Sequence, residues 1–260
     1  LDEQRAIAAF LDRETAKIDA LIDKKQRLAA RLQDKRYGEL TNLVLGLRRN
    51  DSEPTEGFWT ASMPTEWQTV PNRYLFKEYD ERGFEGLPIL NVSIARGVER
   101  RVFSDEKVEQ RSDDLTVYKR ALKGDIVFNK MRMWQGAVGV APIDGLVSPD
   151  YVVARPVIDL ESEYFARLFR TDAYKAEVIR HSYGIVWDRN RLYWDGFASI
   201  KSLFPPYGEQ KQIVEAAREL EVRFSRLAAS IDNQISHLRE YRTALISAAV
   251  TGQIDVRDWV

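Results

Sequence analysis

Cysteine is absent from this chain of 260 residues, and histidine occurs only twice. The absence of cysteine excludes disulfide bonds, thiolate metal sites and a cysteine nucleophile, and it fits a reducing compartment. The two histidines, His181 and His237, are too few and too far apart to indicate a metal site or a catalytic triad. No apolar run is long enough to span a membrane, and the first residues lack the pattern of a signal peptide. We therefore expect a cytoplasmic protein with no membrane partner.

An excess of charge of one sign is also missing, because the formal net charge is −1. The total by itself argues against a nucleic-acid binder. Basic residues are nevertheless enriched locally, in residues 119–132 and 180–191, whereas acidic residues concentrate in residues 78–85 and 105–114. A surface that faces DNA requires only such a local excess, so the charge pattern leaves DNA binding open.

One stretch of the sequence occurs twice. The segment Glu3–Ile7 (EQRAI) returns as Glu209–Ile213 (EQKQI), 206 residues later, and the match continues without a gap to the pair Gly46 and Gly252. An ungapped match of this length indicates one structural element that is present on both sides of an unrelated middle segment.

Both copies have the spacing of a long helix with a narrow apolar stripe. Apolar residues recur in alternating steps of four and three, which is the heptad pattern of coiled-coil helices. A single stripe of this kind favours a helix packed on its own domain, but a doubled and long stripe favours pairing of the two helices. The predicted seam consists of Ile7, Leu11, Ile18, Leu21, Leu28, Leu32, Ile213, Leu220, Phe224, Leu227, Ile231 and Leu238.

The middle segment predicts a compact domain over residues 58–205, after a polar linker at 48–57. Short apolar runs bounded by glycine or proline predict strands at 87–92, 126–128 and 151–154, and residues 162–179 predict a helix. We expect an α+β fold: one mixed α/β domain, flanked by helices at 1–47 and 206–260 that form an antiparallel coiled coil.

Two short motifs imitate catalytic sites. Phe204-Pro205-Pro206-Tyr207 resembles the tetrad of amino-methyltransferases, but its Phe cannot accept hydrogen bonds from a target amino group. Glu209-Gln210-Lys211 imitates a nuclease motif, yet its repeat partner has Arg5 in place of the lysine. Neither a phosphate-binding loop nor a glycine-rich loop for S-adenosylmethionine is present. We therefore expect a chain that catalyses nothing by itself and needs no cofactor.

Clusters of basic and aromatic residues are the positive signal for function. Lys and Arg hold phosphates, and Arg, Asn and Gln read base edges. Any one charged residue of this kind is more often solvated surface, so the clustering carries the prediction. The candidate DNA-binding residues are Lys130, Arg132, Trp134 and Gln135 after one predicted strand, Tyr183, Arg189, Asn190 and Arg191 in a second loop, and Arg96, Arg100 and Arg101 after an earlier strand.

Taken together, these motifs resemble the specificity (S) subunits of type I restriction–modification systems. Pro205-Pro206-x-x-Glu209-Gln210-x-x-Ile213 and the helix ending Arg242–Gly252 are similar to the conserved regions of that family. Gly124–Val127 and Ser148–Tyr151 are similar to its target recognition domains. The resemblance implies a non-catalytic DNA-recognition chain whose domain reads one half of a bipartite target.

The resemblance also implies partners. In that family the helices set the spacing between half-sites and dock the methyltransferase (M) subunits, and the full complex includes a restriction (R) subunit. A complete S subunit carries two recognition domains, whereas this sequence begins at Leu1-Asp2-Glu3 and holds one. We therefore expect a half-subunit or a C-terminal fragment, and a homodimer that buries helix ends such as Ile7 and Leu245.

The rival hypothesis is a coiled-coil adaptor whose middle domain binds a protein or a small ligand. A net charge near zero is its best support. Binding to duplex DNA that weakens steeply with salt distinguishes the two hypotheses.

Overall fold

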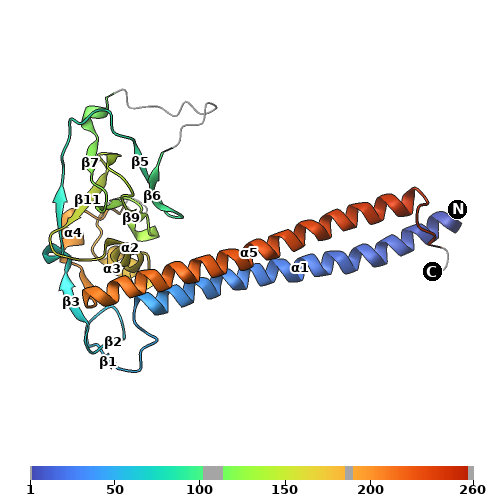
Figure 1. Cartoon of the computed structure of the whole chain (residues 1–260), viewed down its shortest axis with the longest axis horizontal. Coiled ribbons are helices and arrows are strands. Elements are labelled where there is room, and N and C mark those ends of the chain that lie inside the picture. Colours follow the sequence, from blue (N-terminus) through green and yellow to red (C-terminus); the bar gives the residue numbers. More distant parts are fainter. Residues whose placement is uncertain (1, 102–113, 185–189, 257–260) are drawn as a thin grey trace. The chain divides into compact units, whose positions relative to one another are not determined.

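The computed structural model describes residues 2–101, 114–184 and 190–256, which form two compact units (Figure 1). The first, the coil unit, comprises residues 1–40 and 217–260, and the second, the recognition unit, comprises residues 41–216. Two long helices supply most of the coil unit: α1 (Asp2–Val44) and α5 (Tyr207–Val250). The last turn of α1 and the first turns of α5 belong to the recognition unit. In the part of the chain that the structure describes, no helix is long and apolar enough to cross a membrane.

Within the coil unit, α1 and α5 lie side by side and run in opposite directions (Figure 1). Arg242 Nε of α5 donates to Asp19 Oδ1 of α1 at 2.9 Å. Nearer the N-terminus of α1, Phe10 shares an apolar cluster with Ala249 and Val256. Low-numbered residues of one helix therefore meet high-numbered residues of the other, which is the antiparallel arrangement that the repeat predicts.

The seam between the two helices departs from the predicted ladder. Leu21, Leu28 and Leu227 are 41%, 48% and 45% exposed, so they lie outside it. Ile235, which is 7% exposed, occupies the turn at which the ladder has Gln234. The buried and partly buried positions run Ile18, Ile22, Lys25, Ala29 and Leu32 in α1, and Phe224, Ala228, Ile231, Ile235 and Leu238 in α5. These are steps of four and three taken in the opposite order, so the seam shares every second position with the predicted ladder. The prediction of those three leucines as seam residues was wrong because it placed a step of three where the seam has a step of four.

The remaining predicted seam residues lie on the inner side. The buried or partly buried ones are Ile7, Leu11, Ile18, Leu32, Ile213, Leu220, Phe224, Ile231 and Leu238. Ile213 belongs to the core of the recognition unit and not to the coil unit. The expectation that Ile7 and Leu245 are poorly covered was also wrong, because Ile254 and Val256 fold back beside them.

The two repeat copies end their helices in the same way. Gly46 and Gly252 both take left-handed backbone conformations, with φ of 69° and 72°. The amide of the following residue bonds back to a carbonyl five residues earlier, at 2.9 Å in the first copy and 2.8 Å in the second. This is the hydrogen-bonding pattern of a Schellman helix end, which requires glycine at that position. The repeat seen in the sequence is therefore a repeat in structure.

An antiparallel four-stranded sheet forms the centre of the recognition unit, with the order β4-β11-β8-β9. Its strands are β4 (Phe76–Tyr79), β11 (Tyr151–Pro156), β8 (Ile126–Asn129) and β9 (Val138–Val140). The smaller antiparallel pairs are β1 (Ser52–Pro54) with β2 (Ser62–Pro64), β3 (Gln68–Pro71) with β12 (Lys201–Phe204), β5 (Leu90–Ser93) with β6 (Gly97–Arg100), and β7 (Lys119–Ala121) with β10 (Gly145–Val147). Strand β1 thus lies inside the segment expected to be a linker.

Helices lie against this sheet: α2 (Ser162–Leu168), α3 (Asp172–Arg180) and α4 (Trp194–Ser199). The single helix expected over residues 162–179 is two helices, because Thr171 starts a new one by accepting the amide of Tyr174 with its side chain. Short 3-10 helices complete the unit: η1 (Asn72–Tyr74), η2 (Leu115–Val117) and η3 (Met133–Gln135). The predicted fold class, a mixed domain with long flanking helices, is confirmed.

The sheet separates two apolar cores. Along β8, Ile126 and Phe128 enter a large core that contains the residues of α2, α3 and α4. Val127 points to the other face, into a smaller core made mostly of valine and alanine. The β5–β6 hairpin covers that second face with Leu90, Val92 and Val98. Alternation along one strand therefore sorts the domain into a helical layer, the sheet and a hairpin layer.

Candidate nucleic-acid interface

The loop after β8 holds the first predicted group of DNA-binding residues, and it is tightly folded. The side chain of Asn129 accepts the amide of Met131 at 2.9 Å, and its carbonyl accepts the amide of Arg132 at 3.0 Å. Arg132 is exposed. Trp134 is partly buried on the large core and donates its indole N–H to the carbonyl of Met131 at 3.0 Å. Trp134 therefore closes the loop, and Arg132 is the side chain that the loop presents.

Lys130 connects this loop to the second predicted group. Its carbonyl accepts the amide of Leu192 at 3.0 Å, and its Nζ donates to the carbonyl of Pro149 at 3.4 Å. Tyr183 and Arg191 exchange two backbone hydrogen bonds, of 3.2 and 3.1 Å, next to Leu192. The structure thus brings Lys130 and Arg191 together from distant parts of the sequence.

The other members of these groups have similar exposure. Gln135 and Asn190 are partly buried, as are Lys130 and Arg191. Arg189 lies outside the described residues.

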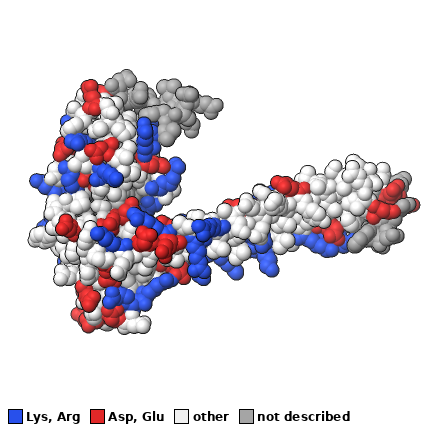
Figure 2. All heavy atoms as spheres, in the orientation of Figure 1, with Lys and Arg blue, Asp and Glu red and all other residues white. Residues whose placement is uncertain are grey.

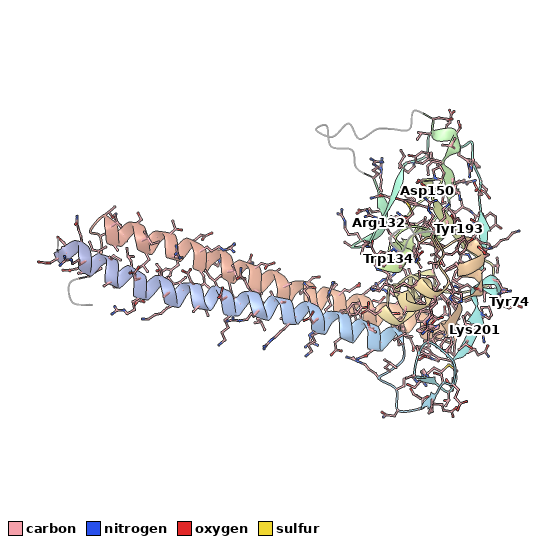
Figure 3. All side chains as sticks on the ribbon, turned by 180° about the vertical axis from the view of Figure 1, so that it is seen from behind. Tyr74, Arg132, Trp134, Asp150, Tyr193 and Lys201 are labelled. Atoms are coloured by element: carbon pink, nitrogen blue, oxygen red, sulfur yellow. The ribbon has the colours of Figure 1, made fainter. Side chains whose placement is uncertain are left out.

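A stacked pair of tyrosines lies in the same region. The rings of Tyr183 and Tyr193 are 4.9 Å apart between centroids, with 24° between their planes. Tyr183 is 55% exposed. Figure 3 shows Tyr193 in the same part of the domain as Arg132 and Trp134. The sequence analysis missed Tyr193; its position two residues after Arg191 on a paired segment was the available signal.

Tyr151 joins the third predicted group to the first. Burial raises the pKa of its hydroxyl, and the positive charges of Arg101 and Arg132 act in the opposite direction. In the sheet, Tyr151 pairs with Asn129, the last residue of β8. The Tyr151 hydroxyl also donates to Asn91 Oδ1 of β5 at 3.4 Å. The hairpin and the loop after β8 thus meet around Tyr151.

The β5–β6 hairpin carries the remaining basic candidates. Arg96 lies in its turn with a side chain that is 76% exposed, and its guanidinium is 3.1 Å from Glu99. Arg100 is exposed at the end of β6. Figure 2 shows Lys and Arg side chains along the edge of the domain formed by β5 and β6. The basic character of this edge is what a phosphate backbone requires.

Not every basic residue of the enriched segments contributes to that surface. Lys119 is 3% exposed and its Nζ lies 3.3 Å from Asp80 Oδ2. The Arg82 guanidinium, supported by Lys119, lowers the pKa of Asp80 to about 2. Lys119 therefore neutralises an acidic neighbour, and the local excess of charge belongs to Arg96, Arg101, Lys130, Arg132 and Arg191.

No family model matches the sequence, and no curated protein matches it. Solved structures do match. The HsdS subunit from Thermoanaerobacter tengcongensis superposes with a TM-score of 0.52 over 98% of this chain, at 18% identity, and 59% of that chain is covered. A chain from a study of complex assembly and conformational transition of the type I R-M system gives a TM-score of 0.56 over 92% of this chain, at 17% identity, with 58% of that chain covered.

At 17% and 18% identity, these similarities define the fold. This chain has the HsdS fold, in the form of two long helices and one mixed domain, so the resemblance found in the sequence is confirmed at the level of the fold. It spans less than two thirds of the length of the HsdS chains that it matches.

Proposed function

We propose that this chain is the DNA-recognition component of a type I restriction–modification enzyme and that its mixed domain reads one half of a bipartite target. Adenine methylation and DNA cleavage belong, on this proposal, to partner M and R subunits. The observation that carries the DNA part is that Tyr151 joins the β5–β6 hairpin to the loop after β8. Its hydroxyl donates to Asn91 Oδ1 at 3.4 Å, and in the sheet it pairs with Asn129, which precedes that loop.

The geometry of this surface suits double-stranded DNA. Arg132 and Arg96 are exposed on loops that are themselves held by hydrogen bonds. Fixed loops lose little conformational entropy on binding. Guanidinium groups suit both phosphates and the edges of guanine, and a tyrosine ring can pack against sugars or bases. The arrangement therefore combines positioning contacts with residues that can read sequence.

A salt-dependence measurement tests this proposal. Replacing Lys130 and Arg132 with alanine removes two cations, so the slope of log affinity against log salt falls by about two for a random-sequence duplex. A matched control replaces Arg73 and Lys77, which are exposed on η1 and β4, and leaves the slope near the wild-type value. Equal affinity and slope for wild type and the Lys130/Arg132 variant would contradict the proposal and favour an adaptor.

The helices supply the docking surface for the M subunit in this proposal. Leu21 and Leu28 are seven residues apart, so they lie on one face of α1, and both are nearly half exposed. Leu227 holds the same repeat position as Leu21 and is equally exposed. An exposed leucine that recurs in both copies suits a protein partner. Leu21→Ser with Leu28→Ser is expected to leave the melting temperature within a few degrees and to abolish co-purification with the cognate M subunit.

A second copy of this chain is the other expected partner. A homodimer presents two identical recognition domains, which suits an inverted, symmetric split site. Light scattering during gel filtration measures the mass directly. A monomer at tens of micromolar, alone and with DNA, removes the homodimer while leaving DNA recognition intact.

A further inference from the structure

The turn between β5 and β6 is held from the opposite layer of the domain by one arginine. Arg170 follows α2, and its Nη2 donates to the carbonyls of Ile94 and Ala95 in the turn, the latter at 3.0 Å. Its Nη1 donates to the carbonyl of Val138 in the edge strand β9 at 3.3 Å. A planar guanidinium with several donors is the side chain suited to bind three carbonyls at once.

This contact bridges two layers that otherwise meet through the sheet. Arg170 comes from the helical layer, passes the sheet at its edge strand and reaches the hairpin layer. The hairpin itself is anchored in the smaller core, where Leu90, Val92 and Val98 pack mostly against alanine and valine. A two-stranded hairpin is marginally stable by itself, and a small apolar cluster stabilises it only weakly. The hydrogen bonds from Arg170 therefore add a specific constraint to the end of the hairpin.

Two glycines create the space for this constraint. Gly97 has a φ of +72°, and a Cβ there would lie 3.2 Å from Nη1 of Arg170. A Cβ at Gly139 would lie 2.6 Å from the backbone nitrogen of Val98. The hairpin backbone therefore approaches β9 more closely than any residue with a side chain would allow. The turn has one tightly defined position against the edge of the sheet.

The side chain that this turn presents is Arg96. The amide of Arg96 donates to Ser93 Oγ at 3.0 Å, which closes the turn internally. Its side chain is 76% exposed and, among the described residues, has an ion pair with Glu99. The backbone of Arg96 is thus fixed from one side by Ser93 and, through Ile94 and Ala95, from the other side by Arg170.

We propose that Arg170 is a positioning residue for DNA recognition, which holds the β5–β6 turn so that Arg96 meets a DNA phosphate. This inference rests on the proposed DNA-binding function. Arg170 acts through Arg96 and not by touching the DNA, because its guanidinium is directed at backbone carbonyls. A loose turn would have to be ordered on binding, at a cost in affinity.

A double-mutant cycle on the full chain tests the link between the two arginines. Arg170→Met keeps the length of the side chain and removes its donors, and Arg170→Lys keeps the charge but not the fork. Arg96→Ala is expected to weaken binding to a random-sequence duplex several-fold, and Arg170→Met to weaken it by a similar factor. In the Arg96→Ala background, Arg170→Met is expected to cause no further loss, because effects that act through one contact are not additive.

The Arg170→Lys variant distinguishes an effect of the hydrogen bonds that hold the turn from an effect of the positive charge. If the arginine acts by its forked hydrogen bonds, the lysine variant is expected to lose affinity like Arg170→Met. Arg180→Met is the matched control, because Arg180 is exposed on α3 with a side chain that is 73% accessible, and its effect is expected to be small. Full affinity for Arg170→Lys would overturn the positioning role and leave only a charge effect.

Hydrogen exchange of the turn amides provides a readout that does not need DNA. The amides of residues 94–97 are expected to exchange faster in Arg170→Met while the amides of β8 and β11 keep their protection. Unchanged exchange in the turn would overturn the proposal, and so would an additive loss of affinity in the Arg96→Ala background. If the wild type fails to bind DNA at all, the proposed function is wrong, and faster exchange still identifies Arg170 as the residue that holds the turn.

Discussion

The two copies of the repeat match at positions such as Gln4 and Gln210, Val44 and Val250, and Gly46 and Gly252, but their ends have different surroundings. At the end of the first copy, a Cβ on Gly46 would lie 2.6 Å from Pro64 Cγ, and Val44 is 2% exposed. At the end of the second copy, Gly252 has nothing within 4 Å of such a Cβ, and Val250 is 64% exposed. The helix ends themselves have the same geometry. The difference therefore comes from what packs on them and not from the helices.

The starts of the two copies differ in the same sense. Gln210 is fully buried; its Nε2 donates to the carbonyl of Pro205 and its Oε1 accepts the amide of Glu161, both at 2.8 Å. Gln4, at the same repeat position, is exposed. Gln210 thus attaches the recognition domain to its helix. In the first copy the helix forms although Gln4 is exposed. Burial of the matching Gln210 is therefore not needed to form the helix, and it serves to attach the domain.

Substitutions in the middle of α1, where it pairs with α5, are expected to give the largest difference in the free energy of unfolding. Ile18→Asp places a carboxylate in the seam and is expected to lower the free energy of unfolding by about 3–4 kcal/mol. Leu21→Asp, only three residues away but 41% exposed, is expected to cost less than about 1 kcal/mol. Urea denaturation followed by circular dichroism measures both. Equal losses would show that the predicted ladder, which includes Leu21, is the true seam.

The glycines at the helix ends give the next largest difference. Gly46→Ala combines a left-handed backbone with a collision against Pro64 and Trp67, and we expect a loss of about 3 kcal/mol. Gly252→Ala has the backbone cost alone, about 1 kcal/mol. The same denaturation experiment tests this pair. If the two alanines cost the same, the two ends are in equivalent surroundings and the comparison fails.

The glutamines give a smaller difference. Gln210→Ala leaves a buried amide and a buried carbonyl without their partner, which costs about 2 kcal/mol. Gln4→Ala removes an exposed side chain and is expected to change stability by less than about 0.5 kcal/mol. Thermal melting of the two variants beside the wild type decides this prediction. A larger loss for Gln4→Ala would mean that the start of α1 has an attachment role of its own.

The helices could be predicted well because a repeat is visible in sequence letters, and the antiparallel order follows from a domain placed between two copies. The seam could not be predicted to the residue, because a ladder can begin with a step of three or a step of four, and the order that occurs leaves Leu28 exposed and buries Ile235 in place of Gln234. The helix at 162–179 was predicted as one element because the capping side chain of Thr171 does not interrupt the apolar pattern.

For the candidate interface, the sequence indicated individual residues but not which of them lie close together in the fold. Arg132 follows a strand, as the apolar run before it indicates. The place of its loop relative to the β5–β6 hairpin depends on Tyr151, which pairs with Asn129 in the sheet and donates to Asn91 of β5. Strand pairing between distant segments has no local signal. Arg170 was missed for a similar reason, because its partners are backbone carbonyls and leave no trace in side-chain composition.

The central claim is that the recognition unit reads a DNA sequence, and selection from a random duplex pool tests it most directly. The full chain, together with the cognate M subunit, is incubated with the pool, and bound duplexes are amplified and sequenced over several rounds. The account predicts enrichment of one short sequence, which the Arg96→Ala and Lys130→Ala/Arg132→Ala variants enrich more weakly. Bound duplexes with the same composition as the starting pool would contradict it.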